Sequence, residues 1–141
     1  MKSWAQRIIP VAAVLAVAWL GGCGPHDVAD LRENPHGVYS FEAPADCNTV
    51  YMRIVGRTRQ RYVIAGPRAH QPGITAKLQP SGESATISLW DGGRIGFRYI
   101  LIADLRQIEP SRTAVDIYCA SRADRKEAIL WGQWANTAYG D

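Results

Sequence analysis

The sequence predicts an α+β domain: an antiparallel sheet of about five strands, a long helix after the first strand and a C-terminal helix packed on the sheet. Three observations support this class. Residues 37–44 alternate in polarity and are followed by helical periodicity. Between residues 74 and 121, four strand-like stretches are separated only by short turn sequences. Residues 121–138 then return to helical periodicity.

The first strand and the long helix follow one another in the sequence. In GVYSFEAP, Tyr39 and Phe41 share one side of the predicted strand. Pro44 suits the first turn of a helix, and Asp46 complements its positive end. The predicted inward face of this helix recurs every three or four residues and consists of Cys47, Tyr51, Ile54, Val55, Thr58 and Tyr62.

The opposite side of the long helix carries a basic stripe. Arg53, Arg57 and Arg61 follow one another at four-residue spacing, so their guanidinium groups line up along the helix. Such a stripe is most often a solvated face. The alternative is contact with anionic lipid headgroups or an acidic partner, where each arginine contributes roughly 1 kcal/mol near a charged membrane surface.

The rest of the predicted sheet and the last helix complete the domain. The strands are ITAKLQ, ESATISLWD, RIGFRYILIADLRQIE and RTAVDIYCAS, with turns at PSG, GG and PS. Short turns of this composition join antiparallel neighbours. The third of these strands is long enough to need a bend or bulge. In the terminal helix, Trp131 and Trp134 lie on the apolar face, and this spacing favours core packing over a ligand-stacking platform.

The N-terminal segment has the features of a secretory signal. Lys2 and Arg7 precede an apolar stretch, residues 8–20, which is shorter than the roughly 20 residues that span a bilayer. The sequence LGGC at residues 20–23 resembles the lipobox of bacterial lipoproteins. This resemblance implies cleavage before Cys23 by the lipoprotein signal peptidase, diacylation of its sulfur and acylation of its new amine. Several acyl chains anchor a protein stably, whereas one binds marginally. The alternative is an ordinary signal peptide with a chance cysteine.

The same resemblance implies a location. Gly24 stands where an Asp resembles an inner-membrane retention signal, so we expect the periplasmic face of the outer membrane. The predicted organisation is a signal peptide (1–22), a lipidated cysteine with a flexible tether (23–36) and a single α+β periplasmic domain (37–141). The mature chain has 14 basic and 13 acidic side chains, which does not favour nucleic-acid binding.

Two cysteines remain besides the lipidation site. Cys47 and Cys119 are 72 positions apart, and both are predicted to point into the core. In an oxidising compartment such a pair is most simply a disulfide, which stabilises by at most about 4.5 kcal/mol in the chain-entropy model. Two buried free thiols, or a metal or redox site, are the alternatives. There is no C-x-x-C motif, and we predict neither a metal nor a cofactor.

Catalytic motifs are lacking in the sequence. It contains no G-x-S-x-G, no H-E-x-x-H and no phosphate-binding glycine loop, so we predict that the protein is not an enzyme. The order of elements is similar to that of helix-grip domains found in periplasmic lipoproteins. Two functions are therefore expected: a membrane-anchored, non-enzymatic interaction module of the cell envelope, or a small-molecule or lipid binder that uses a cleft between sheet and helix.

Overall fold

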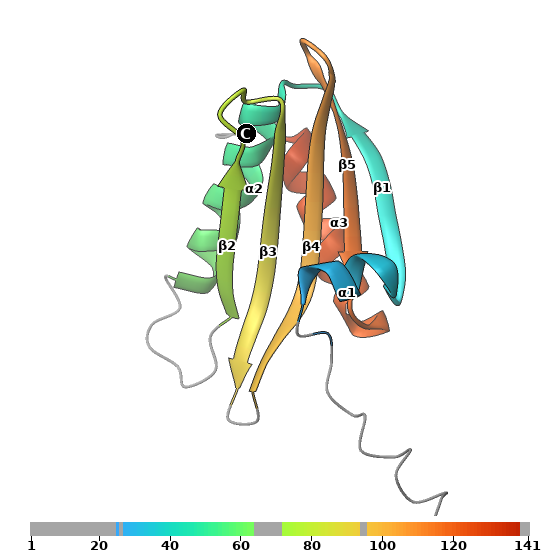
Figure 1. The fold of residues 1–141 in the computed structure, drawn as a ribbon. Coiled ribbons are helices and arrows are strands. Elements are labelled where there is room, and N and C mark those ends of the chain that lie inside the picture. The colour runs from blue at the N-terminus through green and yellow to red at the C-terminus, as the bar shows by residue number, and fades with distance from the viewer. Residues whose placement is uncertain (1–24, 26, 64–71, 94–95, 139–141) are drawn as a thin grey trace, which may run out of the picture.

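The computed structural model describes residue 25 and residues 27–63, 72–93 and 96–138. It consists of one five-stranded antiparallel sheet with helices on both faces (Figure 1). The elements in chain order are α1 (Val28–Glu33), β1 (Gly37–Ala43), α2 (Cys47–Val63), β2 (Pro72–Leu78), β3 (Ser84–Gly93), β4 (Gly96–Glu109), β5 (Arg112–Cys119), the 3-10 turn η2 (Arg122–Asp124) and α3 (Arg125–Asn136).

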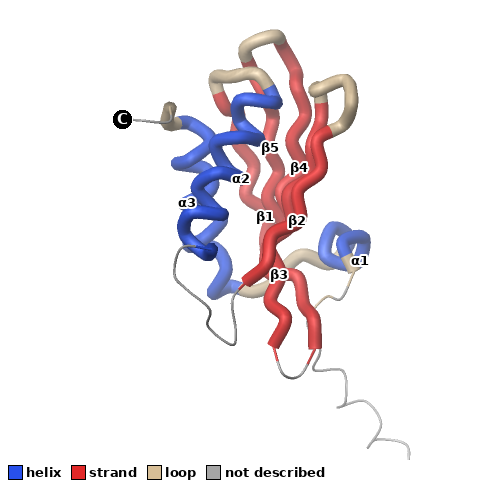
Figure 2. Tube along the Cα trace, turned by 90° about the vertical axis from the view of Figure 1, so that its left-hand side faces the viewer, coloured by secondary structure: helices blue, strands red, loops and turns tan. Residues whose placement is uncertain are grey.

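The strand order in the sheet is β1-β5-β4-β3-β2, and every neighbouring pair is antiparallel. The chain therefore starts at one edge, crosses to the other edge through α2, and returns by three hairpins until β5 pairs with β1. Figure 2 shows α2 and α3 together on one face of the sheet and α1 alone on the other. The predicted α+β class, with its long helix and C-terminal helix, is confirmed.

The core lies between the sheet and the pair α2 and α3. Alternate residues of the strands point into it, as the period of a strand requires. The strand residues of this layer include Ala85, Ile87, Leu89, Leu101, Ala103, Leu105, Val115 and Ile117, and all are buried. From the helices come Val50, Ile54, Ala128 and Ala135, together with Trp131, which is fully buried. Trp134 is partly buried against the same cluster, so the prediction of core packing for both tryptophans is confirmed.

Residues 28–33 of the predicted tether form a helix. Asp27 accepts a hydrogen bond from the backbone N–H of Ala29 and so begins α1, which continues to Glu33. Leu31 on this helix is completely buried, over the face of the sheet where Ile102 is also buried. The prediction of a flexible tether at residues 23–36 is therefore wrong for residues 28–33. Six residues are too few for a helical period to show in the sequence.

The long β4 strand contains the predicted irregularity. Leu89 of β3 lies opposite Leu101, but the next residue, Trp90, lies opposite Tyr99. Ile100 is therefore the extra residue of a β-bulge. Because an extra residue reverses the alternation of a strand, the bulge places Tyr99 and Phe97 on the same face as Trp90, the face that carries α1.

The predicted signal peptide and lipidated Cys23 lie outside the described residues. Within the described part of the chain, no helix combines the length and the apolar character needed to cross a bilayer.

Candidate functional site

A cavity of about 520 Å³ opens where β1 begins and β5 ends. Gly37, the first residue of β1, pairs with Cys119, the last residue of β5. The chain then turns through η2 into α3, and residues of this turn also line the cavity. The side chains that line it include His36, Val38, Tyr39, Ser121, Arg122 and Arg125.

One wall of this cavity is the edge strand β1, which α3 approaches closely. The rings of Tyr39 and Phe41 contact each other, with centroids 5.5 Å apart. A Cβ atom on Gly132 of α3 would lie 2.9 Å from Tyr39 Cε1, so a glycine is needed where the helix crosses these rings. On the opposite face of the strand, Val38 remains 51% exposed. Strand β1 thus offers apolar side chains on both of its faces beside the cavity.

The two edges of the sheet differ in how they are protected. The edge strand β2 carries Pro72 and Lys77, which are residues that oppose pairing with another strand. The edge strand β1 has neither proline nor lysine, and its seven residues pair with β5 without a register shift. On its other side, β1 has no strand partner among the described elements. Its outer backbone groups form a template for an added strand.

The other wall of the cavity is basic. Arg122 and Arg125 are exposed at the start of η2 and α3, and His36 is exposed across from them. Among the residues that the structure describes, none of those lining the cavity is acidic. The one nearby carboxylate on this turn, Asp124, accepts a hydrogen bond of 2.6 Å from the Ser121 hydroxyl. The cavity therefore favours an anionic group.

Sequence reasoning did not identify this cavity, although it left one signal. Cations stabilise the C-terminal ends of helices, whereas Arg122 and Arg125 lie at the N-terminal end of the last helix. These arginines oppose the helix dipole, and Asp124 and Glu127 in the same turns offset them in part. This signal could not locate the cavity, because His36 and Val38 come close to the two arginines only when β1 pairs with β5.

The predicted arginine stripe lies along α2 and binds the last helix. Arg53 Nη1 donates to the carbonyl of Ala135 at 3.0 Å, and Arg57 Nη2 donates to the carbonyl of Ala138 at 2.9 Å. Ala135 lies in the last turn of α3, where backbone acceptors lack intrahelical donors and the dipole is negative, and Ala138 lies two residues after the helix ends. Contact of the stripe with anionic lipids or an acidic partner stays a prediction.

Arg61 pairs with a side chain in the first turn of α3. Its Nε atom lies 3.7 Å from Oε2 of Glu127, which is on α3. Since the side chain of Arg61 is still 52% exposed, this ion pair is weak. Together with Arg53 and Arg57, it gives α2 a polar seam against α3 beside the apolar core.

The structure corrects the predicted disulfide. Cys47 and Cys119 are both buried and free. The Cys47 N–H donates to the side chain of Gln107, which pairs with Thr113 at the start of β5, while Cys119 ends that strand. Six residues of strand separate these positions by about 20 Å, and a disulfide needs Cα atoms within about 7 Å. Burial raises the pKa of both thiols, and the charges of Asp46 and Asp124 add to this rise for Cys47 and Cys119 respectively.

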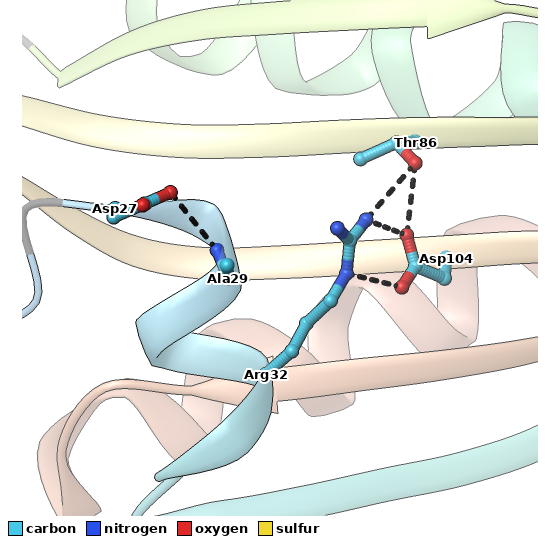
Figure 3. A network of polar contacts seen from close by, with 5 residues as sticks. All are labelled: Asp27, Ala29, Arg32, Thr86 and Asp104. Atoms are coloured by element: carbon cyan, nitrogen blue, oxygen red, sulfur yellow. Dashed lines mark hydrogen bonds and ion pairs between the residues drawn. The ribbon is translucent and has the colours of Figure 1, made fainter.

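A polar network on the other face of the sheet holds α1. Arg32 Nε donates to Asp104 Oδ2 at 2.7 Å, and Nη2 donates to the second oxygen of the same carboxylate. The Thr86 hydroxyl donates to Asp104 at 2.8 Å and accepts from Arg32 at 3.3 Å (Figure 3). The hydrogen bond from Arg32 to Asp104 is the main reason why the pKa of this guanidinium is raised. An aspartate between Ala103 and Leu105 in an apolar strand was the sequence signal for this contact.

The part of the chain that the structure describes contains no set of ligands for a metal ion. No three His, Cys, Asp or Glu side chains of the described residues come together in a group that could hold an ion. Comparison with known proteins adds no assignment: no protein-family model matches the sequence, and no curated protein matches it either.

Proposed function

We propose that this protein is a membrane-anchored periplasmic lipoprotein that acts as a non-enzymatic interaction module in the cell envelope. Its N-terminal segment supports the anchor, because LGGC at residues 20–23 resembles a lipobox and implies acylation of Cys23. The periplasmic face of the outer membrane is the location that Gly24 favours. The observation that carries the interaction role is the unprotected edge of β1 beside a basic cavity.

The partner that fits this edge is an extended segment of another envelope protein. Its backbone would pair with the outer edge of β1, and main-chain hydrogen bonds of this kind supply affinity without requiring a particular sequence. Specificity would come from side chains: apolar ones against Val38 and Tyr39, and an acidic one between Arg122 and Arg125. Such a segment needs no reaction at the site, which agrees with the lack of catalytic motifs.

A second function, binding of an anionic small molecule or lipid, is favoured by the size of the cavity. Its volume of about 520 Å³ falls within the usual range for ligand sites, about 300–1,000 Å³. Such a ligand would lie at the end of β1 rather than between the sheet and α2. There the inward side chains of α2, such as Val50 and Ile54, are fully buried against the strands.

Site-specific photo-crosslinking in cells distinguishes these functions. A crosslinking amino acid replaces Val38, and a matched one replaces Met52, which is 57% exposed on α2 away from the cavity. We expect a discrete protein adduct from position 38 only, with the crosslinked peptide identified by mass spectrometry as a single segment. The double change Arg122→Glu and Arg125→Glu should abolish this adduct.

Other patterns of crosslinked adducts would lead to different conclusions. An adduct of lipid or metabolite mass at position 38 supports the second function. The same adducts at positions 38 and 52, or none at 38, would show that β1 is not a contact surface. Intact mass measurement of the protein from membranes tests the anchor separately, and the absence of acyl chains on Cys23 would overturn it.

A further inference from the structure

We propose that the β3–β4 hairpin is a membrane-contact element that inserts aromatic side chains into the headgroup region of the bilayer that holds the lipid anchor. This inference rests on the proposed acylation of Cys23. The residues that carry it are Trp90, Phe97 and Tyr99, here called the aromatic cluster.

The aromatic cluster is a continuous surface of rings on one face of the hairpin. The ring centroids of Trp90 and Phe97 are 5.0 Å apart, and those of Phe97 and Tyr99 are also 5.0 Å apart. The cluster lies on the face of the sheet that does not carry α2 and α3, so it is not part of the main core. Phe97 is 38% exposed, and Trp90 and Tyr99 are partly exposed.

The indole of Trp90 is held in a fixed position. Its Nε1–H donates to the hydroxyl of Thr75 at 3.1 Å. The ring lies directly over Gly73, where a Cβ atom would come within 2.1 Å of it. Rigid Trp and Tyr side chains with one apolar and one polar part are those enriched at membrane–water interfaces. The cluster thus has the residue types and the preorganisation of an interfacial contact.

The N-terminal chain lies against this cluster. The backbone N–H of Tyr99 donates to the carbonyl of Pro25 at 3.0 Å. Pro25 is two residues after Cys23, and two residues of extended chain span at most about 7 Å. The headgroup region on each side of a bilayer is about as thick, at 5–7 Å. An acylated Cys23 would therefore bring the membrane surface to the aromatic cluster.

The two ends of β4 differ in a way that agrees with this orientation. At the end near Pro25 the strand presents Phe97 and Tyr99. At the other end it presents Glu109, which forms an ion pair with Arg112 at 2.7 Å, and a solitary exposed Ile108. Figure 1 shows these two hairpins at opposite ends of the sheet. The aromatic side chains of β4 therefore gather at the end of the strand where the anchor would be.

The rings of the aromatic cluster carry no charge of their own. Arg98, between the two aromatic residues of β4, is paired in register with Asp91 of β3. The part of the contact that the rings make should depend weakly on salt, whereas the exposed Arg122 and Arg125 at the same end of the sheet would add a part that salt weakens. The weak salt dependence of the part that the rings make separates it from a contact through the arginine stripe of α2, which salt would weaken.

Fluorescence quenching of the full-length mature protein in vesicles tests the proposal. Trp90, Trp131 and Trp134 are the tryptophans after residue 22, and the latter two pack on the other side of the sheet. In phosphatidylcholine vesicles with a quencher at headgroup depth, we expect quenching of the wild type and its loss in Trp90→Phe. The quenching should persist at high salt, because the rings carry no charge.

Two matched variants establish which end of β4 meets the membrane. Phe97→Ser should reduce the quenching or, for unacylated chain, weaken vesicle partitioning about tenfold, because an apolar ring is lost. Ile108→Ser, at a position with the same 38% exposure, should have no effect. Phe97→Leu should restore contact, and circular dichroism checks that each variant is folded.

The outcomes separate this inference from the proposed function. Equal quenching of the wild type and Trp90→Phe, or equal effects of Phe97→Ser and Ile108→Ser, would overturn the membrane-contact role even if the protein is acylated. If intact mass shows no acyl chains on the protein from cells, the proposed anchor fails. Lack of vesicle partitioning by that unacylated chain would then overturn the aromatic contact as well.

Discussion

At the scale of single residues, Asp46 shows how one side chain starts the longest helix of the protein. It precedes Cys47, the first residue of α2, and accepts hydrogen bonds from the Thr49 hydroxyl at 2.6 Å and the Thr49 N–H at 2.9 Å. Both hydrogen bonds lower the pKa of the Asp46 carboxyl, and the bond from the Thr49 hydroxyl has the larger effect. Asp46 is the N-cap of α2, whereas the sequence pattern placed it inside the first turn, after Pro44, where its charge would complement the helix dipole.

Replacing Asp46 should therefore destabilise the domain in a pH-dependent way. Asp46→Ala is expected to lower the free energy of unfolding by about 1 kcal/mol at pH 7. Because the folded-state pKa is lowered, the charge-dependent part of this stabilisation is present above the unfolded pKa of about 3.9 and is lost as the pH falls through the folded value. Asp46→Asn keeps a capping oxygen and should retain most of the stability at pH 7. Urea unfolding at pH 7 and in acid measures both effects, and equal stability of the Ala and Asn variants would contradict the capping role.

At the scale of elements, α1 is held by one buried side chain and one network. Leu31 is completely buried, and Arg32 forms a bidentate contact with Asp104 of β4. Since the two charged side chains are 36% and 31% exposed, solvent screens the pair, and its contribution is modest. The network instead determines the position in which this short helix lies on the sheet.

We expect Arg32→Ala to release α1 while the rest of the fold stays intact. Loss of the bidentate contact should cost about 1 kcal/mol and increase hydrogen exchange at the amides of Leu31 and Asn34, which are bonded within α1. Arg32→Lys should rescue only in part, because an ammonium group cannot make the planar two-point contact. Arg106→Ala, two residues beyond Asp104 on the same strand, serves as the control. Unchanged exchange in α1 after Arg32→Ala would show that Leu31 alone holds the helix.

The packing of β2 against β3 depends on a glycine. Gly73 lies opposite Trp90, and its lack of a side chain lets the indole lie over the strand. In Gly73→Ala the new methyl group would lie 2.1 Å from the ring, so the ring must move and lose its bond to Thr75. Unfolding free energy should fall by about 1–3 kcal/mol, as overpacking typically costs. A shift in tryptophan emission should accompany this loss. Gly37→Ala, where an added Cβ meets nothing within 4 Å, is the matched control.

At the scale of the whole molecule, the two ends of the sheet are different environments. Cys47 lies at the end where β1 leads into α2, and Cys119 lies at the end with the cavity and the aromatic hairpin. The domain is therefore held by its core and by the contacts of α2 with α3, with no covalent link between its described cysteines.

This arrangement predicts the behaviour of the thiols. Denatured, unreduced protein should show two reactive thiols, from Cys47 and Cys119, whereas native protein at pH 7 should react slowly because burial raises both pKa values. Raised pKa values favour the neutral thiols in the folded state. Their stabilising effect is fully present below the unfolded pKa of about 8.5 and is lost as the pH rises through the folded values. Thiol counting and unfolding at pH 7 and pH 10 measure this. Absence of reactive thiols in the denatured protein would mean that the two cysteines are bonded.

Local patterns in the amino-acid sequence were enough to predict the type and order of the main elements and most of the side chains that face the core. Periodicity is a local property, so alternation in β5 and helical spacing around Trp131 were enough to predict their burial correctly. The position along each element at which the inward-facing side chains meet depends on tertiary packing. Cys47 and Cys119 both point inward as predicted, yet they lie at opposite ends of the sheet, because the side-chain period specifies a face and not a position along the strand. For the same reason the contact of Arg32 with Asp104, the contact of Arg53 with α3 and the cavity at the start of β1 all depend on pairings between distant parts of the chain, which no local pattern encodes.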